Sequence, residues 1–323
     1  MTEQFVVGVD LGGTKILTAL ADGAGHIIAE QKISTESAKG QEHVINRIVH
    51  TVEYVLQAAG VEREQVRALA LGAPGPVDAV NGVIHFAPNL VWHDVPICQV
   101  LEQHLSLPVF LDNDANLAAL GEHVYGAGQG VNHMVYMTVS TGIGGGLILD
   151  GKLYHGASGV AGEIGHMTVM PGGPLCGCGK RGCMEAVASG TAIAREAREL
   201  ATGGQAEKIL ALAGGEIAAI TAATVAGAAE AGDPAALDII KHAARYLGIG
   251  LANIITLLNP SRIVLGGGVI NIGEPLLKDI RQEVQAHVME DAGAAARIVR
   301  AKLGGHSGVM GAIALALQAD IAA

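Results

Sequence analysis

Three of the four cysteines in the 323-residue chain lie within eight residues, at positions 176, 178 and 183. His166 precedes the first of them by ten residues, and glycines at 177, 179 and 182 allow a short loop to wrap tightly. Three thiolates and one imidazole are a ligand set that Zn²⁺ takes in a closed tetrahedron. We therefore predict a zinc site made by His166, Cys176, Cys178 and Cys183.

Two alternatives to zinc stay open: an iron–sulfur cluster on the same ligands, and three buried thiols beside an unrelated histidine. Four protein ligands leave no position for a substrate, so the predicted zinc is structural. It would tie His166 to the cysteine loop and bring Glu163 and Glu185 toward one pocket. Each glutamate taken singly is equally typical of a surface charge. Cys98, alone in sequence, is typical of a small buried residue.

Two glycine turns each lie between apolar runs that read as strands: Asp10-Leu-Gly-Gly-Thr-Lys15 and Thr141-Gly-Ile-Gly-Gly-Gly146. Neither matches a Walker A loop or a Rossmann fingerprint. Such turns offer backbone N–H groups that bind phosphate oxygens, although each alone is also consistent with a plain turn. Asp10 can hold Mg²⁺ through water, and the three glycines 266–268 would let a base or ribose approach the backbone. The predicted nucleotide-binding residues are Asp10, Gly12, Gly13, Thr14, Lys15, Thr141, Gly142, Gly266 and Gly267.

Asp112-Asn113-Asp114 stands where an apolar strand ends and a helix begins. Asn and Asp are good helix caps, so capping is one interpretation. The other is a general base, because a carboxylate can orient a hydroxyl and accept its proton. Composition alone does not choose between Asp112 and Asp114.

Taken together, the segments 10–15, 141–147, 163–166 and 176–185 resemble the ROK family of sugar kinases and repressors, most closely its bacterial glucokinases. The resemblance runs from about residue 5 to the C-terminus. It implies a two-domain actin/hexokinase-like α/β fold with a cleft between ribonuclease-H-like domains. It also implies ATP-dependent phosphorylation of a hexose, for which the leading hypothesis is the 6-hydroxyl of glucose with Mg-ATP as donor, and a homodimer or homotetramer.

The resemblance also assigns roles to single residues. Asp114 would be the catalytic base, and the sugar would be bound by Gly75, Asn89, Asn113, Asp114, Glu163, His166 and Glu185. Zinc binding leaves one imidazole nitrogen of His166 for a hydrogen bond, and the resemblance gives this bond to a sugar hydroxyl. Kinases for N-acetylmannosamine, N-acetylglucosamine, fructose or mannose remain alternatives, as do a sugar-sensing regulator and a zinc-dependent hydrolase.

The elements that must position these residues can be read from apolar runs and helical spacing. Strands are expected at 5–9, 16–21, 26–33, 66–72, 109–111, 133–139, 263–270 and 298–299. Helices are expected at 44–59, 96–105, from 112–116 onward, at 234–258 and at 307–319. One device, strand–glycine turn–strand, occurs twice, and the second one is followed by Asp150-Gly151, which predicts a hairpin turn. We therefore expect two similarly built domains facing across a cleft, a smaller one of residues 1–115 plus 307–323 and a larger one of 116–306.

The net charge of −11 and the absence of a basic stripe argue against a nucleic-acid or anionic-membrane surface. The N-terminal residues do not resemble a signal peptide, and no apolar run has the length of a membrane span. These features favour the cytoplasm, and together with the resemblance they imply a cytoplasmic enzyme of carbohydrate metabolism. The first strand begins near Phe5, which leaves no room for the DNA-binding segment expected of the family's repressors.

Overall fold

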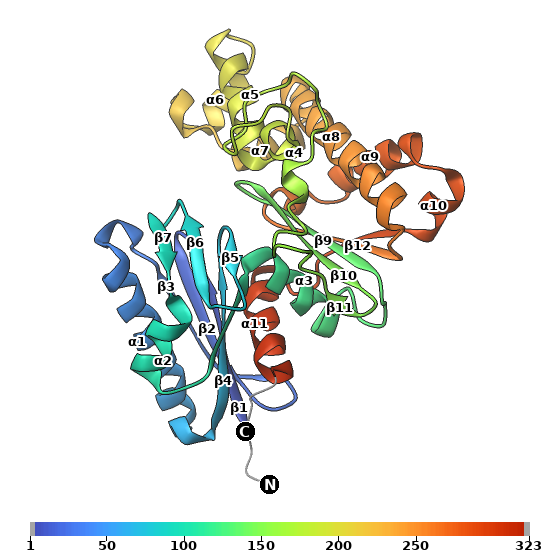
Figure 1. The fold of residues 1–323 in the computed structure, drawn as a ribbon. Coiled ribbons are helices and arrows are strands. Elements are labelled where there is room, and N and C mark those ends of the chain that lie inside the picture. Colours follow the sequence, from blue (N-terminus) through green and yellow to red (C-terminus); the bar gives the residue numbers. More distant parts are fainter. Residues whose placement is uncertain (1–3, 320–323) are drawn as a thin grey trace. The chain divides into compact units, whose positions relative to one another are not determined.

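The computed structural model describes residues 4–319 as a mixed α/β protein with three β-sheets (Figure 1). The chain divides into two compact units. The first comprises Met1–Asn132, Gly146–Gly162 and Ala301–Ala323, and the second comprises His133–Gly145 and Glu163–Arg300. Within residues 4–319, no helix is long and apolar enough to cross a membrane.

The first unit is built on a five-stranded sheet of order β3-β2-β1-β4-β8. Its strands are β1 (Phe5–Leu11), β2 (Lys15–Ala21), β3 (Ile27–Ser34), β4 (Val66–Ala73) and β8 (Val109–Asn113). β1, β2 and β3 pair antiparallel, whereas β1–β4 and β4–β8 pair parallel. A small sheet adds β5 (Val77–Asp78), β6 (Val83–Ala87) and β7 (Trp92–Val95). Because β1 and β4 are buried along almost their whole length, both sheet faces must be covered.

Helices cover both faces of this sheet (Figure 1). The first unit contains α1 (Gln41–Ala59), α2 (Ile97–Leu105), α3 (Asp114–Tyr125) and α11 (Ser307–Gln318), with 3-10 turns η1 (Ser37–Lys39), η2 (Arg63–Gln65) and η6 (Gly304–His306). One core joins Val7 and Val9 to Ile48 of α1, and the other joins Val6 to α11. A Cβ at Gly311 would lie 1.7 Å from the Leu117 carbonyl oxygen, so glycine is required where α11 crosses α3.

The second sheet has the order β11-β10-β9-β12-β13. Its strands are β9 (Met134–Val139), β10 (Ile143–Leu149), β11 (Lys152–Leu153), β12 (Arg262–Gly266) and β13 (Arg297–Arg300). β9, β12 and β13 run parallel, and the boundary between the units falls within β10. The β10–β11 hairpin turns at Asp150 and Gly151, both with positive φ, as the Asp-Gly pair predicts.

The helices of the second unit flank the loop that contains the three clustered cysteines and surround a cavity that is described below. They are α4 (Met184–Ala188), α5 (Gly190–Thr202), α6 (Glu207–Leu212), α7 (Ala222–Glu230), α8 (Pro234–Leu258), α9 (Glu274–His287) and α10 (Glu290–Ala295), with 3-10 turns η3 (Ile164–His166), η4 (Ile217–Ala219) and η5 (Val269–Ile272). α8 begins where the sequence predicts, because Asp233 caps the N–H of Ala236 and Pro234 takes the first helical position.

One strand differs from the expected elements. The strand expected at 263–270 ends at Gly266, because Gly267 has a φ of 90° and cannot continue it. The expected domain boundaries at 115/116 and 306/307 stay a prediction. By contacts alone, the structure assigns α3 to the first unit, where it packs closely on α11.

Candidate active site and metal centre

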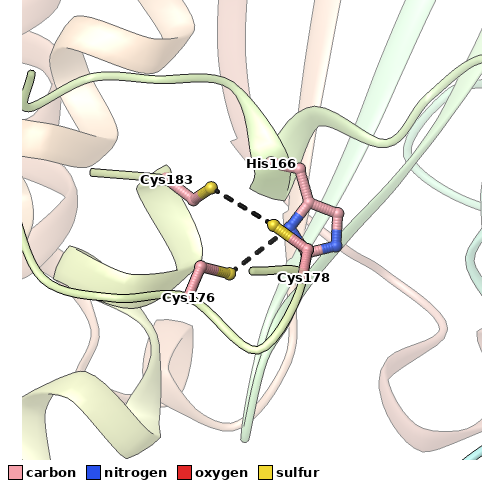
Figure 2. Close-up of side chains that lie close together, drawn as sticks. All are labelled: His166, Cys176, Cys178 and Cys183. Atoms are coloured by element: carbon pink, nitrogen blue, oxygen red, sulfur yellow. Dashed lines mark hydrogen bonds between the residues drawn. The ribbon is translucent and has the colours of Figure 1, made fainter. Parts of the chain in front are cut away.

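The structure gathers the four predicted zinc ligands into one cluster, with their side chains turned toward one another (Figure 2). Their ligand atoms all lie within 4.8 Å of one another. Cys176 Sγ is 3.6 Å from His166 Nδ1, and Cys178 Sγ is 3.6 Å from Cys183 Sγ. Ligands placed about 2.0–2.3 Å from a tetrahedral zinc ion are themselves roughly 3.5–4 Å apart. The cluster therefore has the composition and dimensions of a tetrahedral metal site.

The loop that carries the cysteines is folded by its glycines. Gly179, at a φ of 83°, turns the chain so that its N–H donates to the Cys176 carbonyl oxygen. Gly182, at a φ of 74°, passes so close to Met170 that a Cβ would lie 1.7 Å from the Met170 carbonyl oxygen. These glycines are needed both for backbone conformation and for space, as the sequence pattern indicates.

Burial sets the protonation of the thiols. It raises the pKa of Cys176, and it raises the pKa of Cys183 to about 12. Cys178 is exposed, and the backbone N–H of Lys180 holds its pKa below the ordinary value. A divalent cation among the three sulfur atoms would stabilise their thiolate forms, because metal binding displaces thiol protons.

Two glutamates lie next to the metal cluster. His166 turns Nδ1 toward Cys176, while its Nε2 is 3.8 Å from Glu163 Oε2. Glu185 Oε1 accepts from the Cys176 thiol at 3.7 Å, and Glu185 Oε2 accepts from the backbone N–H of Ile143 at 2.9 Å. The structure thus places both predicted sugar-binding glutamates beside the cluster, while their contact with a sugar stays a prediction.

A cavity of about 610 Å³ lies wholly within the second unit. Its lining includes Thr141 of the second glycine turn and Gly268 after β12. Thr191 on its wall donates a hydrogen bond to the Thr141 carbonyl oxygen at 2.8 Å, which fixes the turn. Of the predicted nucleotide-binding residues in this unit, Gly142, Gly266 and Gly267 do not line the cavity. Gly267 still shapes it, because a Cβ there would lie 2.3 Å from the Val139 carbonyl oxygen.

Sequence reasoning missed several residues of this cavity. They stand on α5, on η5, and on α7 with its capping residue Thr221, and include Thr191, Arg198, Thr221, Ala226, Glu230 and Asn271. No glycine pattern or cluster of reactive groups marks them in the sequence. They come together only through helix packing, so no signal in the sequence alone could have identified them.

The first glycine turn joins β1 to β2 in the first unit. The N–H of Gly12 donates to the Lys15 carbonyl oxygen, and Thr35 Oγ1 donates to the Gly12 carbonyl oxygen at 2.6 Å. Burial raises the pKa of Asp10, and Lys15, whose Nζ lies 3.9 Å from Asp10 Oδ2, opposes that rise. Gly13 packs on Asn89: a Cβ at Gly13 would lie 2.7 Å from the Asn89 Cβ atom. The turn therefore brings Gly13 beside Asn89, two residues that the sequence had assigned separately to the nucleotide and to the sugar.

The junction of β8 and α3 distinguishes the two aspartates that sequence composition left equivalent. Asp112 is buried, and its carboxylate accepts from the Asn113 N–H, from Asn116 Nδ2 and from His155 Nε2. Asp114 is only partly buried at the start of α3, where its Oδ1 accepts from the N–H of Ala115. A buried carboxylate with three donors is poorly placed to receive a substrate proton, so Asp114 is the better candidate base.

Asn113 links this junction to the loop Ala73-Pro74-Gly75. Its Oδ1 caps α3 by accepting from the N–H groups of Ala115 and Asn116, and its Nδ2 donates to the Gly75 carbonyl oxygen at 3.0 Å. Gly75 has a φ of 85°, and a Cβ there would lie 2.1 Å from the Phe86 carbonyl oxygen. Asn113 therefore both caps α3 and holds the loop that contains Gly75. Thr35 and His155 are the further polar partners that the sequence did not reveal.

The family model of the ROK family matches residues 6–319. A glucokinase of Halalkalibacterium halodurans is 42% identical over 312 residues, which cover 96% of this chain and 94% of that protein. A xylose repressor of Caldicellulosiruptor bescii is 30% identical, covering 97% of this chain and 78% of that protein. The crystal structure of a ROK family glucokinase from Streptomyces griseus, in complex with glucose and AMPPNP, aligns with a TM-score of 0.84 at 39% identity, covering 98% of this chain and all of that one. The expected two-domain actin-like fold is thereby confirmed, and the chain belongs to the ROK family.

Proposed function

We propose that this protein is a glucokinase that transfers the γ-phosphoryl group of ATP to the 6-hydroxyl of glucose. The observation that carries the proposal is the β8–α3 junction. There Asp112 is buried and saturated with donors, which leaves Asp114 as the carboxylate at the helix start. The glucokinase relatives, 37–42% identical over nearly the whole chain, support the same activity.

Asp114 would orient the 6-hydroxyl of glucose and accept its proton as the bond to phosphorus forms. Asn113, Asn89 and the Gly75 loop would supply further contacts to the sugar from the first unit. Glu163, Glu185 and the Nε2 atom of His166 would bind sugar hydroxyls from the second unit. A carboxylate can accept two hydroxyl hydrogen bonds, so this set is chemically suited to a polyol.

The nucleotide would occupy the cavity of the second unit, whose volume of about 610 Å³ falls in the range of small-molecule sites. Its lining includes Thr141, Thr191 and glycines at 190, 227 and 268, which have no side chains in the way. The turn residues 12–15 would contact the phosphates, and Asp10 would hold Mg²⁺ through water. Magnesium bound with ATP would neutralise charge on the transferring phosphoryl group, and most of the remaining catalysis is positioning.

The cluster His166, Cys176, Cys178 and Cys183 fits a structural zinc ion, because all four ligands come from the protein and their ligand atoms all lie within 4.8 Å of one another. Bound zinc would add stability and orient His166. The chain's own contribution is to hold the imidazole so that Nε2, on the side away from Cys176, can accept or donate a hydrogen bond.

The finer assignments are proposals of the same kind. A homodimer or homotetramer follows from the family resemblance, whereas the cytoplasm as the place of action and the expected domain boundaries rest on the sequence features given above. A kinase for another hexose is one alternative, because the candidate sugars differ from glucose by only one hydroxyl or acetamide group that the pocket must recognise. A sugar-sensing regulator is the second candidate, because xylose repressors match 95–97% of this chain at 30–31% identity.

The decisive experiment measures ADP release from Mg-ATP with glucose, mannose, fructose, N-acetylglucosamine and N-acetylmannosamine side by side. The proposal expects the highest kcat/KM with glucose, and NMR of the product should place the phosphate on the 6-hydroxyl. Turnover dominated by another sugar would replace glucose in the assignment. Binding of a sugar without any turnover would favour the regulator and remove the catalytic role from Asp114.

A further inference from the structure

Two residues before the candidate base Asp114, the buried carboxylate of Asp112 has no part in the proposed reaction. Asp112 is 2% exposed. Its Oδ1 accepts from the N–H of Asn113 at 2.7 Å and from Asn116 Nδ2 at 2.9 Å. Its Oδ2 accepts from His155 Nε2 at 2.7 Å. A buried carboxylate is unfavourable unless donors compensate it, so each of these three contacts matters.

His155 is the only one of the three donors that comes from a distant part of the sequence. It follows β11, and its loop is closed by a hydrogen bond from the N–H of Ala161 to the His155 carbonyl oxygen. Gly156, at a φ of 72°, bends this loop, and a Cβ there would lie 3.0 Å from the Ala161 Cβ. The imidazole is thus presented to Asp112 from a loop with its own fixed shape.

The contact between His155 and Asp112 is short and strongly polar. The hydrogen bond to Asp112 raises the pKa of His155, and partial burial of the ring opposes that rise. His155 is thereby biased toward the imidazolium, which donates a charge-assisted hydrogen bond to the carboxylate. Asn116 already donates its Nδ2 to Asp112 Oδ1, and its buried Oδ1, an acceptor without a partner among the described residues, cannot replace the donor that His155 supplies.

Asp112 in turn fixes the backbone on which the candidate site residues stand. It is the second-to-last residue of β8, and its Oδ1 holds the N–H of Asn113, the residue that caps α3 and immediately precedes Asp114. A rotation of the Asp112 side chain would release this N–H. It would also alter the direction in which Asn113 and Asp114 leave the strand.

We propose that His155 is a positioning residue for phosphoryl transfer: it holds the buried Asp112, and through Asp112 it fixes the backbone that presents Asn113 and Asp114 to the sugar. The proposal rests on the proposed sugar-kinase function, in which Asp114 is the base. His155 itself touches neither substrate in this assignment. Its effect is on geometry, and phosphoryl transfer is sensitive to displacement of about 1 Å in the reacting groups.

The test compares two substitutions of His155. His155→Gln keeps a side-chain N–H that can reach Asp112, whereas His155→Phe keeps a planar ring and removes the donor. His155→Phe should lower kcat with glucose by roughly tenfold to hundredfold, because the site geometry loosens. His155→Gln should retain kcat within about threefold, since the hydrogen bond but not the charge remains. The KM for ATP should stay unchanged in both, because His155 does not line the nucleotide cavity.

A matched control is His26→Phe. His26 also pairs with an aspartate, since its Nδ1 lies 3.1 Å from Asp22 Oδ2, but its side chain is 81% exposed and the pair is outside the candidate site. This variant should keep the kcat of the unmodified protein. Melting temperatures are recorded for all variants, and kcat is measured well below them so that loss of folded protein is not read as loss of catalysis. Should His155→Phe fail to fold, His155→Ala replaces it.

A double-mutant cycle asks whether His155 acts through Asp112. Asp112→Asn is combined with His155→Phe, and the four kcat values are compared. If His155 works through Asp112, the double variant should have nearly the kcat of Asp112→Asn alone. If the two losses multiply, His155 acts by another route and the proposal is wrong.

The outcomes separate this proposal from the proposed function. Equal kcat for the unmodified protein and His155→Phe would overturn the positioning role alone, and so would a lower melting temperature with unchanged kcat. Absence of turnover by the unmodified protein with any sugar of the panel would overturn both proposals together.

Discussion

The carboxylate of Glu185 joins the metal cluster to the second glycine turn. Its Oε2 accepts a hydrogen bond from the backbone N–H of Ile143 at 2.9 Å, and its Oε1 accepts from the Cys176 thiol at 3.7 Å. Gly142 fits beside it only because it lacks a side chain, since a Cβ there would lie 2.3 Å from Glu185 Oε2. Glu185, a proposed sugar ligand, is therefore hydrogen-bonded to a proposed phosphate-binding turn and lies beside the candidate metal cluster, all within the second unit; the contact from Cys176 requires the protonated thiol, whereas the bond from Ile143 does not.

The two contacts of Glu185 predict that Glu185→Gln and Glu185→Ala will affect different KM values. In Glu185→Gln the amide oxygen can still accept from Ile143, but the NH₂ group cannot accept from a sugar hydroxyl. We expect the KM for glucose to rise by roughly tenfold or more, because a charged hydrogen bond to the sugar is lost. The KM for ATP should be unchanged. Glu185→Ala releases the turn as well, so both KM values should rise. Steady-state kinetics with each substrate varied decides this.

Glu199→Gln serves as the control for Glu185, because Glu199 is an exposed residue of α5 that pairs weakly with Arg195. Its kinetics should match those of the unmodified protein. An unchanged glucose KM in Glu185→Ala would remove Glu185 from the sugar site.

Asp114→Asn should keep sugar binding and lose turnover. The asparagine can still accept a hydrogen bond from the 6-hydroxyl, but it cannot take the proton, and general-base catalysis contributes roughly 10²–10⁴-fold. Sugar affinity is measured by calorimetry, or by the fluorescence of Trp92, the single tryptophan of the chain. Asp238→Asn, an exposed change on α8, is the control. Normal turnover by Asp114→Asn would require another base.

Local sequence signals predicted the parts of this protein that local chemistry determines. The zinc ligands were predicted because cysteine spacing and glycines at 177, 179 and 182 are properties of one short loop. α8 was predicted because Asp233 and Pro234 are a cap and a first-turn residue, and apolar residues follow at helical spacing. The β10–β11 turn followed from Asp150 and Gly151 for the same reason.

The remaining parts depend on packing between distant segments, which single-sequence patterns do not carry. Asp112 and Asp114 have the same composition and neighbouring positions, and only burial and the approach of His155 distinguish them. Thr191 and Arg198 line the cavity because α5 packs beside α7, not because of any motif around them. The roles assigned by resemblance stay predictions until they are tested by substitution.

The metal site predicts that Cys178→Ser abolishes stoichiometric zinc binding and lowers the melting temperature by roughly 5–10 °C, since a structural metal contributes directly to folding. Elemental analysis should find one zinc ion per chain in the unmodified protein. Cys98→Ala is the control, because Cys98 is buried in the core of the first unit, away from the cluster, where burial raises its pKa to about 12. Unchanged zinc content and melting temperature in Cys178→Ser would contradict the metal-site assignment. Iron in place of zinc would favour the iron–sulfur alternative.

The cavity of the second unit predicts a selective loss of nucleotide affinity. Ala226 of α7 lines the cavity, and Ala226→Phe would fill part of its volume of about 610 Å³. We expect the KM for ATP to rise roughly tenfold or more, with sugar binding unchanged, because a filled cavity excludes part of the ligand surface. Ala211→Phe, at an exposed position of α6 outside the cavity, is the control. Equal effects on ATP and glucose would indicate damage to folding instead.

The pair His155–Asp112 predicts how stability depends on pH. The hydrogen bond to Asp112 raises the pKa of His155 above its ordinary value of 6.5, so the folded state binds this proton more tightly than the unfolded state does. The stabilisation is therefore fully present below pH 6.5 and is lost as pH rises through the raised folded-state pKa. The melting temperature of the unmodified protein minus that of His155→Gln should shrink as pH is raised from about 6 to about 9. A difference that stays constant over this range would mean that His155 holds Asp112 as a neutral donor, and the predicted pH dependence would be wrong.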